Sequence, residues 1–166
     1  MKKQEKIPYQ EVFLALNKAG VDYAVCGGLA VVLYGYARLT MDLDLIVSLE
    51  KENLEKIYDT LSVLGYQPQI PIKKEEFIDK VRLEKLAKEK NMKVVSFYNK
   101  KDPFEAVDIG VNLPDVQKLL AKKKKMRMNN FYIPIITIKD LIKMKEDLAR
   151  PRDLIDAENL KKIKEE

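Results

Sequence analysis

The order of hydrophobic and polar residues predicts helices and strands that follow one another from the start of the chain. Apolar residues recur at the spacing of one helix face over residues 9–19, which predicts a helix. Residues 21–26 are rich in strand-forming residues and predict a strand. This strand ends at Gly27-Gly28, and the apolar residues 29–36 predict a short buried helix after it. The first third of the chain therefore contains a strand, a glycine turn and a helix in direct succession.

Residues 41–47 alternate between polar and aliphatic side chains, which is typical of a strand with one face in the core. Asp42 and Asp44 fall on one face of this strand, and the aliphatic residues fall on the other. A helix over about residues 51–64 is predicted next, with Ser48 in its N-cap region.

A charged segment over residues 73–90 has a helical pattern, with Phe77, Val81, Leu83 and Leu86 as its apolar stripe. The same periodicities predict the remaining elements: strands over residues 93–98 and 104–111 joined by a hairpin loop, a short helix over 115–121, a strand over 131–136, a helix from the N-cap Thr137 to about residue 149, and a last helix over 152–164 after Pro151. Together these elements predict an α/β (α+β) fold, a small mixed sheet flanked by helices with helices at the C-terminal end.

The length of 166 residues suits one domain, and we expect a single domain over residues 1–166 because no linker, repeat or low-complexity tract divides the chain. Hydrophobic residues make up 46 % of the chain and charged residues 34 %, which excludes disorder as its main state. No apolar run approaches the roughly 18 residues that span a membrane, so we expect a cytoplasmic protein without a membrane partner. The Lys and Glu content resembles that of a thermophile protein.

The net charge and the scarcity of His and Cys limit the kinds of ligand and catalytic site that the chain can have. The net charge of +5 suits an anionic partner such as a nucleotide or a nucleic acid. The chain contains no His, which excludes an imidazole base and His zinc ligands, and its one cysteine, Cys26, is predicted to be buried and inert. Acid–base or metal chemistry would therefore depend on carboxylates, which favour hard cations such as Mg²⁺ or Mn²⁺.

Three aspartates are the candidate metal ligands. Asp42 and Asp44 lie about 7 Å apart along a strand, close enough for their side chains to converge on metal ions. Asp108 would join the same face if its strand pairs beside residues 41–47. Three carboxylates without a local Lys form a site of the two-metal type that serves phosphoryl or nucleotidyl transfer. The alternative is that all three face solvent on amphipathic strands.

The Gly27-Gly28 turn is an independent candidate site. A strand that turns through two glycines into a helix presents backbone N–H groups and a positive helix end, which suit phosphate. Taken alone, the same two residues are equally typical of a tight turn without a ligand.

These residues carry a family resemblance. Cys26-Gly27-Gly28, a thirteen-residue spacer and Asp42-x-Asp44 are similar to the signature of the nucleotidyltransferase fold. Two longer strings resemble the AbiEii-like branch of that superfamily, the abortive-infection and toxin-type minimal nucleotidyltransferases: Gly27-Gly28-Leu29-Ala30 with Arg38-x-Thr40-x-Asp42-x-Asp44, and residues 135–145 followed by Arg150-Pro151-Arg152-Asp153-Leu154-x-Asp156. The resemblance covers nearly the whole chain.

The resemblance implies a role for each matching residue. Asp42 and Asp44 would hold the metal ions, and Asp108 would be the third ligand and help to deprotonate the acceptor hydroxyl. The other matching residues would contact the nucleotide: Gly27 and Gly28 along the triphosphate, Arg38 and Thr40 at a phosphate or as braces of the site, and Lys145, Arg150, Arg152 and Asp153 from the C-terminal helices. The chain departs from the family where Gly28 replaces a common Ser and Arg152 replaces a Lys.

Lys122–Lys125, with Lys118 and Arg127, form the densest positive stretch of the chain. One interpretation is a solvated loop or helix face, and the other is a phosphate-tracking patch for RNA. Residues 66–100 carry no feature that we can connect to chemistry.

The sequence thus predicts a Mg²⁺-dependent nucleotidyltransferase that moves an NMP from an NTP to a hydroxyl of RNA, tRNA or protein, as the toxin of a toxin–antitoxin pair with an antitoxin protein as partner. One alternative is a catalytically inactive nucleotide- or RNA-binding module of the same fold. Another is a structural partner protein whose carboxylates belong only to its surface.

Overall fold

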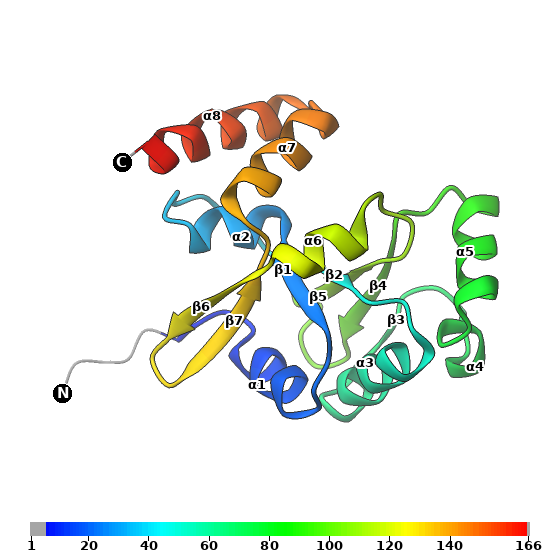
Figure 1. The fold of residues 1–166 in the computed structure, drawn as a ribbon. Coiled ribbons are helices and arrows are strands. Elements are labelled where there is room, and N and C mark those ends of the chain that lie inside the picture. The colour runs from blue at the N-terminus through cyan, green and yellow to red at the C-terminus, as the bar shows by residue number, and fades with distance from the viewer. Residues whose placement is uncertain (1–5, 166) are drawn as a thin grey trace.

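Strands from distant parts of the chain pair into one mixed sheet in the computed structural model, which describes residues 6–165 (Figure 1). The strand order is β3-β4-β5-β2-β1-β7-β6. The strands are β1 Tyr23–Cys26, β2 Leu43–Val47, β3 Tyr66–Pro68, β4 Val94–Asn99, β5 Ala106–Gly110, β6 Lys124–Met128 and β7 Phe131–Ile135.

Helices lie around this sheet within the described residues. They are α1 Gln10–Lys18, α2 Gly27–Leu33, α3 Lys51–Val63, α4 Lys74–Phe77, α5 Lys80–Glu89, α6 Val116–Lys122, α7 Ile138–Leu148 and α8 Pro151–Glu165. In Figure 1, α7 and α8 lie together at the top, while α1 and α3 lie side by side at the bottom. The predicted α/β (α+β) fold, a mixed sheet flanked by helices, is confirmed.

The centre of the sheet is buried because its strands are almost entirely apolar. All four residues of β1 are buried, and so are four of the five residues of β2. β1 pairs antiparallel with β2 and parallel with β7, and β2 pairs parallel with β5. The exception in β2 is Asp44, which is only partly buried. One acidic residue therefore lies near the start of a strand that is otherwise hydrophobic.

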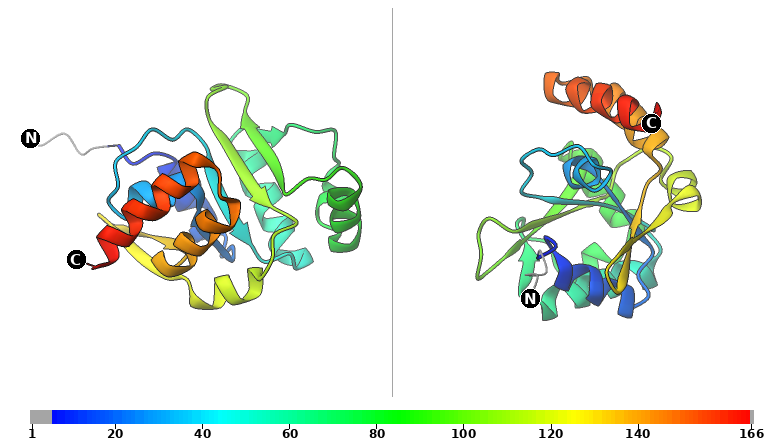
Figure 2. Two further views of the ribbon diagram at one scale, coloured as in Figure 1. Left: turned by 90° about the horizontal axis from the view of Figure 1, so that it is seen from above. Right: turned by 90° about the vertical axis from the view of Figure 1, so that its left-hand side faces the viewer.

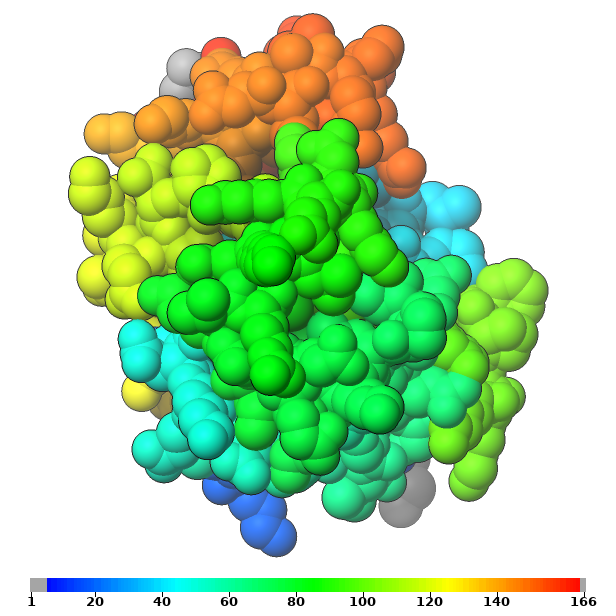
Figure 3. All heavy atoms as spheres, turned by 90° about the vertical axis from the view of Figure 1, so that its right-hand side faces the viewer, coloured from blue at the N-terminus to red at the C-terminus, as the bar shows by residue number. Residues whose placement is uncertain are grey.

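The C-terminal helices form a separate layer over one side of the sheet. Figure 2 shows α7 and α8 packed against each other, and α2 lies between α7 and the strands β1 and β2. Thr137 is the N-cap of α7, as predicted, and its hydroxyl oxygen accepts a hydrogen bond from the Asp140 N–H at 3.1 Å. Figure 3 shows the orange helical pair above the green segment that contains α5 and the start of β4.

Three sequence predictions about the first ninety residues are wrong in detail. Residues 73–90 form two helices, α4 and α5, with a break at residues 78–79, and Val81 is 75 % exposed instead of lying in an apolar stripe. Ser48 is not the N-cap of α3; that position is Glu50, whose N–H donates to the Ser48 hydroxyl. Asp42 precedes β2, because the ladder begins at Leu43.

Two edge strands were not predicted from the sequence. β3 is only three residues long and ends at Pro68, and its residues fell in the segment without assigned features. β6 contains Lys124 and Lys125, which were expected in a loop or helix face. Both strands lie at the edges of the sheet, where short strands, proline and lysine are common.

No helix within residues 6–165 combines the length and the apolar character that crossing a lipid bilayer requires.

Candidate active site

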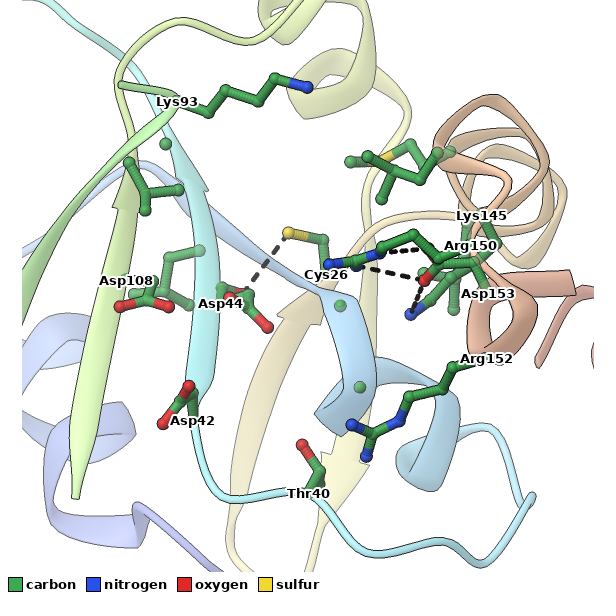
Figure 4. Close-up of a pocket in the computed structure, with 18 of the residues that line it drawn as sticks. Cys26, Thr40, Asp42, Asp44, Lys93, Asp108, Lys145, Arg150, Arg152 and Asp153 are labelled. Atoms are coloured by element: carbon green, nitrogen blue, oxygen red, sulfur yellow. Dashed lines mark hydrogen bonds and ion pairs between the residues drawn. The ribbon is translucent and has the colours of Figure 1, made fainter. Parts of the chain in front are cut away.

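The pairing of β2 with β5 brings two of the candidate carboxylates together. Asp44 stands directly opposite Asp108 in the parallel ladder, so both side chains lie on the same face of the sheet. Asp42 lies two residues before Asp44, and Figure 4 shows all three carboxylates on one side of the cleft. The predicted convergence of strands 41–47 and 104–111 is thus present.

Asp108 has a further partner on the neighbouring strand. Ser96 on β4 is the cross-strand partner of Asp108, and its hydroxyl donates a hydrogen bond of 2.6 Å to Asp108 Oδ1. Among residues 6–165, none of the three aspartates forms an ion pair with a Lys or an Arg. The carboxylates therefore repel one another, and the charge of Lys145 near Asp44 opposes this repulsion only in part.

Burial and this repulsion raise the pKa values of two of the aspartates. The pKa of Asp44 is raised to about 7, first by burial and then by the negative charges of Asp108 and Asp42. The pKa of Asp42 is also raised, first by burial and then by Asp108. Such raised values are typical of functional carboxylates, because a bound cation would relieve the repulsion that causes them.

The glycine turn packs directly onto Asp44. Gly27 has a φ of +66°, a conformation that favours glycine, and a Cβ built at this position would lie 2.1 Å from Asp44 Oδ2. A Cβ at Gly28 would lie 2.7 Å from Thr40 Oγ1 and 3.0 Å from Arg38 Nη1. Both glycines are therefore required by the close approach of polar side chains to the turn.

Cys26 is buried under the same turn. Its side chain is part of the core at 5 % exposure, and its thiol donates to the Asp44 carbonyl oxygen at 3.6 Å. Burial raises the pKa of the Cys26 thiol, which keeps it protonated. This agrees with the prediction of a buried cysteine.

Three cations near the site, Arg38, Lys145 and Arg150, are bound to acidic residues of α8. Lys145 is 4 % exposed, and its Nζ lies 3.3 Å from Asp153 Oδ1 and 3.0 Å from Asp156 Oδ2. Arg150 Nε lies 2.6 Å from Asp153 Oδ2. The pKa of Asp153 is lowered, because Arg150 and Lys145 outweigh the opposing effect of its burial.

A second part of this network connects α8 to the loop before β2. Arg38 donates to both carboxylate oxygens of Asp156, at 2.9 Å from Nε and 3.1 Å from Nη2, and to the Leu39 carbonyl oxygen at 2.9 Å. Arg152 donates to the same Leu39 carbonyl oxygen at 2.7 Å. Of the two roles that the resemblance implied for Arg38, the geometry favours the brace over the free phosphate ligand.

A cleft of about 890 Å³ joins these features. All of the site residues that the sequence predicted line it: Gly27, Gly28, Arg38, Thr40, Asp42, Asp44, Asp108, Lys145, Arg150, Arg152 and Asp153. Figure 4 shows Asp44 on β2, Asp108 on β5 and the labelled residues of the C-terminal segment around the cleft. The structure therefore gathers at one cleft residues that lie more than a hundred positions apart in the chain.

The chemistry of the donors fits a hard divalent cation, whereas their present arrangement is not a ready binding site. Three carboxylates supply the oxygen ligands that Mg²⁺ prefers, and the missing side chain at Gly27 lets Asp44 lie against the turn. Within residues 6–165, however, no group of three or more His, Cys, Asp or Glu side chains is placed to hold a metal ion. Binding would require the aspartate side chains to turn toward a common point.

Several residues around the cleft escaped the sequence analysis. Lys93 and a group of aliphatic side chains line one end of it. Asp156 was part of the C-terminal string but had no role assigned to it. The Tyr9 hydroxyl contacts the Met41 carbonyl oxygen and the Ala106 backbone, and so connects the starts of β2 and β5. Each of these contacts joins distant parts of the chain, so no local pattern marks them.

The lysine run lies outside the cleft. None of Lys122–Lys125 lines it. Lys122 Nζ is 3.0 Å from Asp140 Oδ1, and Lys123 is paired with Asp22. Two of the four positive charges are therefore partly neutralised within the protein, and binding of RNA along this run stays a prediction.

Comparison with known proteins places this geometry in a known fold. No protein-family model matches the chain, and no curated protein matches its sequence. Among solved structures, the lincosamide antibiotic adenylyltransferase LnuA with bound lincomycin has a TM-score of 0.61 at 18 % identity, over 96 % of this chain and 99 % of that one.

Two further solved structures are similar to the chain in fold. The antibiotic-resistance factor ANT(2'')-Ia has a TM-score of 0.57 at 10 % identity, over 92 % of this chain and 78 % of that one. An antigenic nucleotidyltransferase-like protein from Paracoccidioides brasiliensis has a TM-score of 0.56 at 13 % identity, over 90 % and 71 %. The chain has the nucleotidyltransferase fold. The narrower resemblance to the AbiEii-like branch stays a prediction.

Proposed function

We propose that the protein is a Mg²⁺-dependent nucleotidyltransferase that moves a nucleoside monophosphate from an NTP to a hydroxyl acceptor. The observation that carries this proposal is the position of Asp44, which stands opposite Asp108 in the ladder and directly against Gly27. One contact thus joins a candidate metal ligand to a candidate phosphate-binding turn. The nucleotidyltransferase fold of the chain supports the same activity by analogy.

Residues of the cleft could bind the metal ions and the triphosphate that this reaction needs. Asp42, Asp44 and Asp108 would hold Mg²⁺, or Mn²⁺ in its place. When bound, such ions neutralise charge on the phosphates and polarise the attacking and leaving oxygens. The backbone of Gly27 and Gly28 lies beside these carboxylates and would receive the triphosphate, with Thr40 next to it.

The transfer itself breaks one bond and forms one. The acceptor oxygen forms a bond to the α-phosphorus of the NTP while the bond from that phosphorus to the bridging oxygen of the β-phosphate breaks. Pyrophosphate leaves, and Asp108 takes the proton of the acceptor hydroxyl. Arg150 and Arg152 lie at the cleft, where positive charge stabilises the leaving pyrophosphate most. Arg38, Lys145 and Asp153 hold the C-terminal helices in place around the nucleotide.

A transfer assay tests the proposal. The protein is incubated with α-labelled NTPs, Mg²⁺ and, in separate reactions, total RNA, cell lysate and a panel of small hydroxyl compounds. We expect label in one acceptor fraction, and none with Asp44→Asn. Equal transfer by Asp44→Asn, or no transfer by the wild type, would contradict the proposal. RNA or protein as the labelled fraction would support a role as a toxin and prompt a search for an antitoxin partner.

A second function is favoured by one observation. Because the three aspartates do not stand in a ready metal-binding arrangement, a nucleotide- or RNA-binding module without turnover is the alternative. Calorimetry separates the two, since a non-catalytic module would bind NTP equally well with and without Mg²⁺ and would be unaffected by Asp42→Asn.

A further inference from the structure

The cleft has two ends of different chemistry. Gly28, Thr40, Arg38 and Arg152 surround the polar end, which the proposed function assigns to the triphosphate. Aliphatic and thioether side chains from the start of β4, the loop after β5 and α7 also line the cleft, and we call this group its apolar end: Val94, Leu113, Leu141, Met144 and Leu148. Leu39 and Met41, on either side of Thr40, are further apolar residues of the lining. Leu148 is 45 % exposed and Val94 is 36 % exposed, so apolar surface is open to a ligand there.

Lys93 stands at the edge of the apolar end. Figure 4 shows its side chain beyond Asp108 and Asp44, at the far end of the cleft from Thr40 and Arg152. The backbone at this position is fixed, because the Lys93 carbonyl oxygen accepts a hydrogen bond of 2.9 Å from the Val111 N–H.

Lys93 differs in its partners from three of the other four cations that line the described cleft; the fourth, Arg152, donates to the Leu39 carbonyl oxygen. Arg38, Lys145 and Arg150 are each paired with an aspartate of α8. Lys93 forms no ion pair within the described residues 6–165. The ammonium group of Lys93 is therefore available to pair with an anionic group of a ligand that binds the apolar surface beside it.

The same surface is unsuited to a polycation. The carboxylates that line the described cleft are Asp42, Asp44, Asp108 and Asp153. The first three are assigned to the metal, and Asp153 is bound by Arg150 and Lys145. No carboxylate is left at the apolar end to pair with an amine.

The surface is equally unsuited to a nucleic acid. Single-stranded RNA is typically held by aromatic side chains that stack on its bases, and within residues 6–165 no aromatic residue lines the cleft. The basic run Lys122–Lys125 lies outside it. The whole cleft, which includes the part assigned to the triphosphate, has a volume of about 890 Å³, and this falls in the range of small-molecule sites.

We infer that the apolar end is the acceptor subsite, and that it takes a compact hydroxyl compound with an apolar body and an anionic group that faces Lys93. This inference rests on the proposed function for the identity of the reaction. Binding of a ligand to the apolar end does not require catalysis, so this binding can be measured without an active enzyme.

The first experiment uses a fluorescent anion with an apolar body, 8-anilinonaphthalene-1-sulfonate, as the probe. We expect one saturable site, open in the presence of saturating Mg²⁺ and ATP, with an affinity that Lys93→Met lowers about two- to fivefold. The control is Lys18→Met, which removes an exposed lysine of α1 outside the cleft and should leave the affinity unchanged. Equal affinity in Lys93→Met, no saturable site, or displacement by ATP would overturn the inference.

The second experiment compares two competitors of the probe that share a benzyl alcohol body and differ in the charge of the group opposite it. We expect 4-(hydroxymethyl)benzoate to displace it at a lower concentration than 4-(aminomethyl)benzyl alcohol, and Lys93→Glu to reverse this order. The cation as the better competitor of the wild type would overturn the inference. Binding of Mg²⁺ and ATP is measured separately by calorimetry, so a failure of the proposed function and a failure of the acceptor subsite give different results.

Discussion

At the scale of single residues, the site depends on how closely Asp44 approaches the glycine turn. Asp44 Oδ2 occupies the space that any side chain at position 27 would need. The Asp44 carboxylate therefore lies directly against the backbone of the turn before any ligand binds. A metal-bound triphosphate requires a metal ligand and a phosphate-binding turn side by side, because the metal and the phosphates must be held together.

Gly27→Ala tests this contact. We expect it to lower the free energy of unfolding by about 1–3 kcal/mol, because alanine is strained at positive φ. We also expect loss of Mg²⁺-dependent ATP binding, because Asp44 must turn away from the new methyl group. Urea unfolding and calorimetry measure the two effects.

Gly35→Ala is the matched control for this prediction. Gly35 also has a positive φ, +112°, but a Cβ there would meet nothing within 4 Å. The control should lose stability and retain ATP binding. Retention of ATP binding by Gly27→Ala would contradict the role given to the contact.

The glycine turn and the first two aspartates could be predicted from the sequence because they lie close together in the chain. Gly27, Gly28, Asp42 and Asp44 lie within one stretch whose polar positions break an apolar pattern. Lys93 resembles any other lysine in the chain, and only the fold brings it to the cleft. A residue whose role depends on one distant neighbour has no local signal.

At the scale of elements, buried ion pairs attach the C-terminal helices to the rest of the protein. Asp156 on α8 is 1 % exposed, and it accepts hydrogen bonds from Arg38 and lies 3.0 Å from Lys145 Nζ. The pair fixes α8 over the loop before β2, which carries Thr40 and Asp42. The position of the helices and the shape of the cleft therefore depend on the same contact.

Asp156→Asn should destabilise the protein by about 3 kcal/mol, because it leaves the buried Lys145 and the partly buried Arg38 without their full compensation. Denaturant unfolding measures this change. The control is Glu158→Gln on the same helix, which breaks an exposed pair with Lys162 and should change the stability by less than about 0.5 kcal/mol. Similar changes in both variants would show that the network does not hold α8 in place.

The pairing of Asp153 predicts a dependence on pH. Its pKa is lowered in the folded protein from an ordinary value of 3.8, so the folded state binds this proton less readily than the unfolded state. The stabilisation is therefore present above about pH 4 and is lost as the pH falls below that value. Urea unfolding at pH 5 and pH 3 should show wild type more stable than Asp153→Asn at pH 5, with a smaller difference at pH 3. A difference that stays constant with pH would contradict this account.

Elements were predictable where burial sets the pattern and less so at the edges of the sheet. β1, β2 and β5 have apolar residues that the core selects, and all three were predicted. β6 was missed because Lys124, Lys125 and Arg127 conceal its strand character, and only pairing with β7 makes it a strand. Tertiary pairing overrides local preference most readily at such edges.

At the scale of the whole molecule, the sheet order explains why one cleft contains the whole candidate site. β2 lies between β1 and β5, so the glycine turn after β1 and Asp108 on β5 flank Asp44 from its two sides. β7 lies on the other side of β1 and leads directly into α7, which carries Lys145 over the cleft. The sequence predicted the class of fold and the site residues, but the two-ended character of the cleft required the fold itself.

The most direct test of the account is the binding of ATP measured by calorimetry with and without Mg²⁺. The control variant is Asp59→Asn, which changes an exposed aspartate of α3 outside the cleft. If the three carboxylates hold the metal beside the glycine turn, wild type and Asp59→Asn will bind ATP at least tenfold more tightly with Mg²⁺, and Asp44→Asn and Asp108→Asn will lose that gain. ATP binding that does not depend on Mg²⁺, or a gain that survives in Asp44→Asn, would contradict the account.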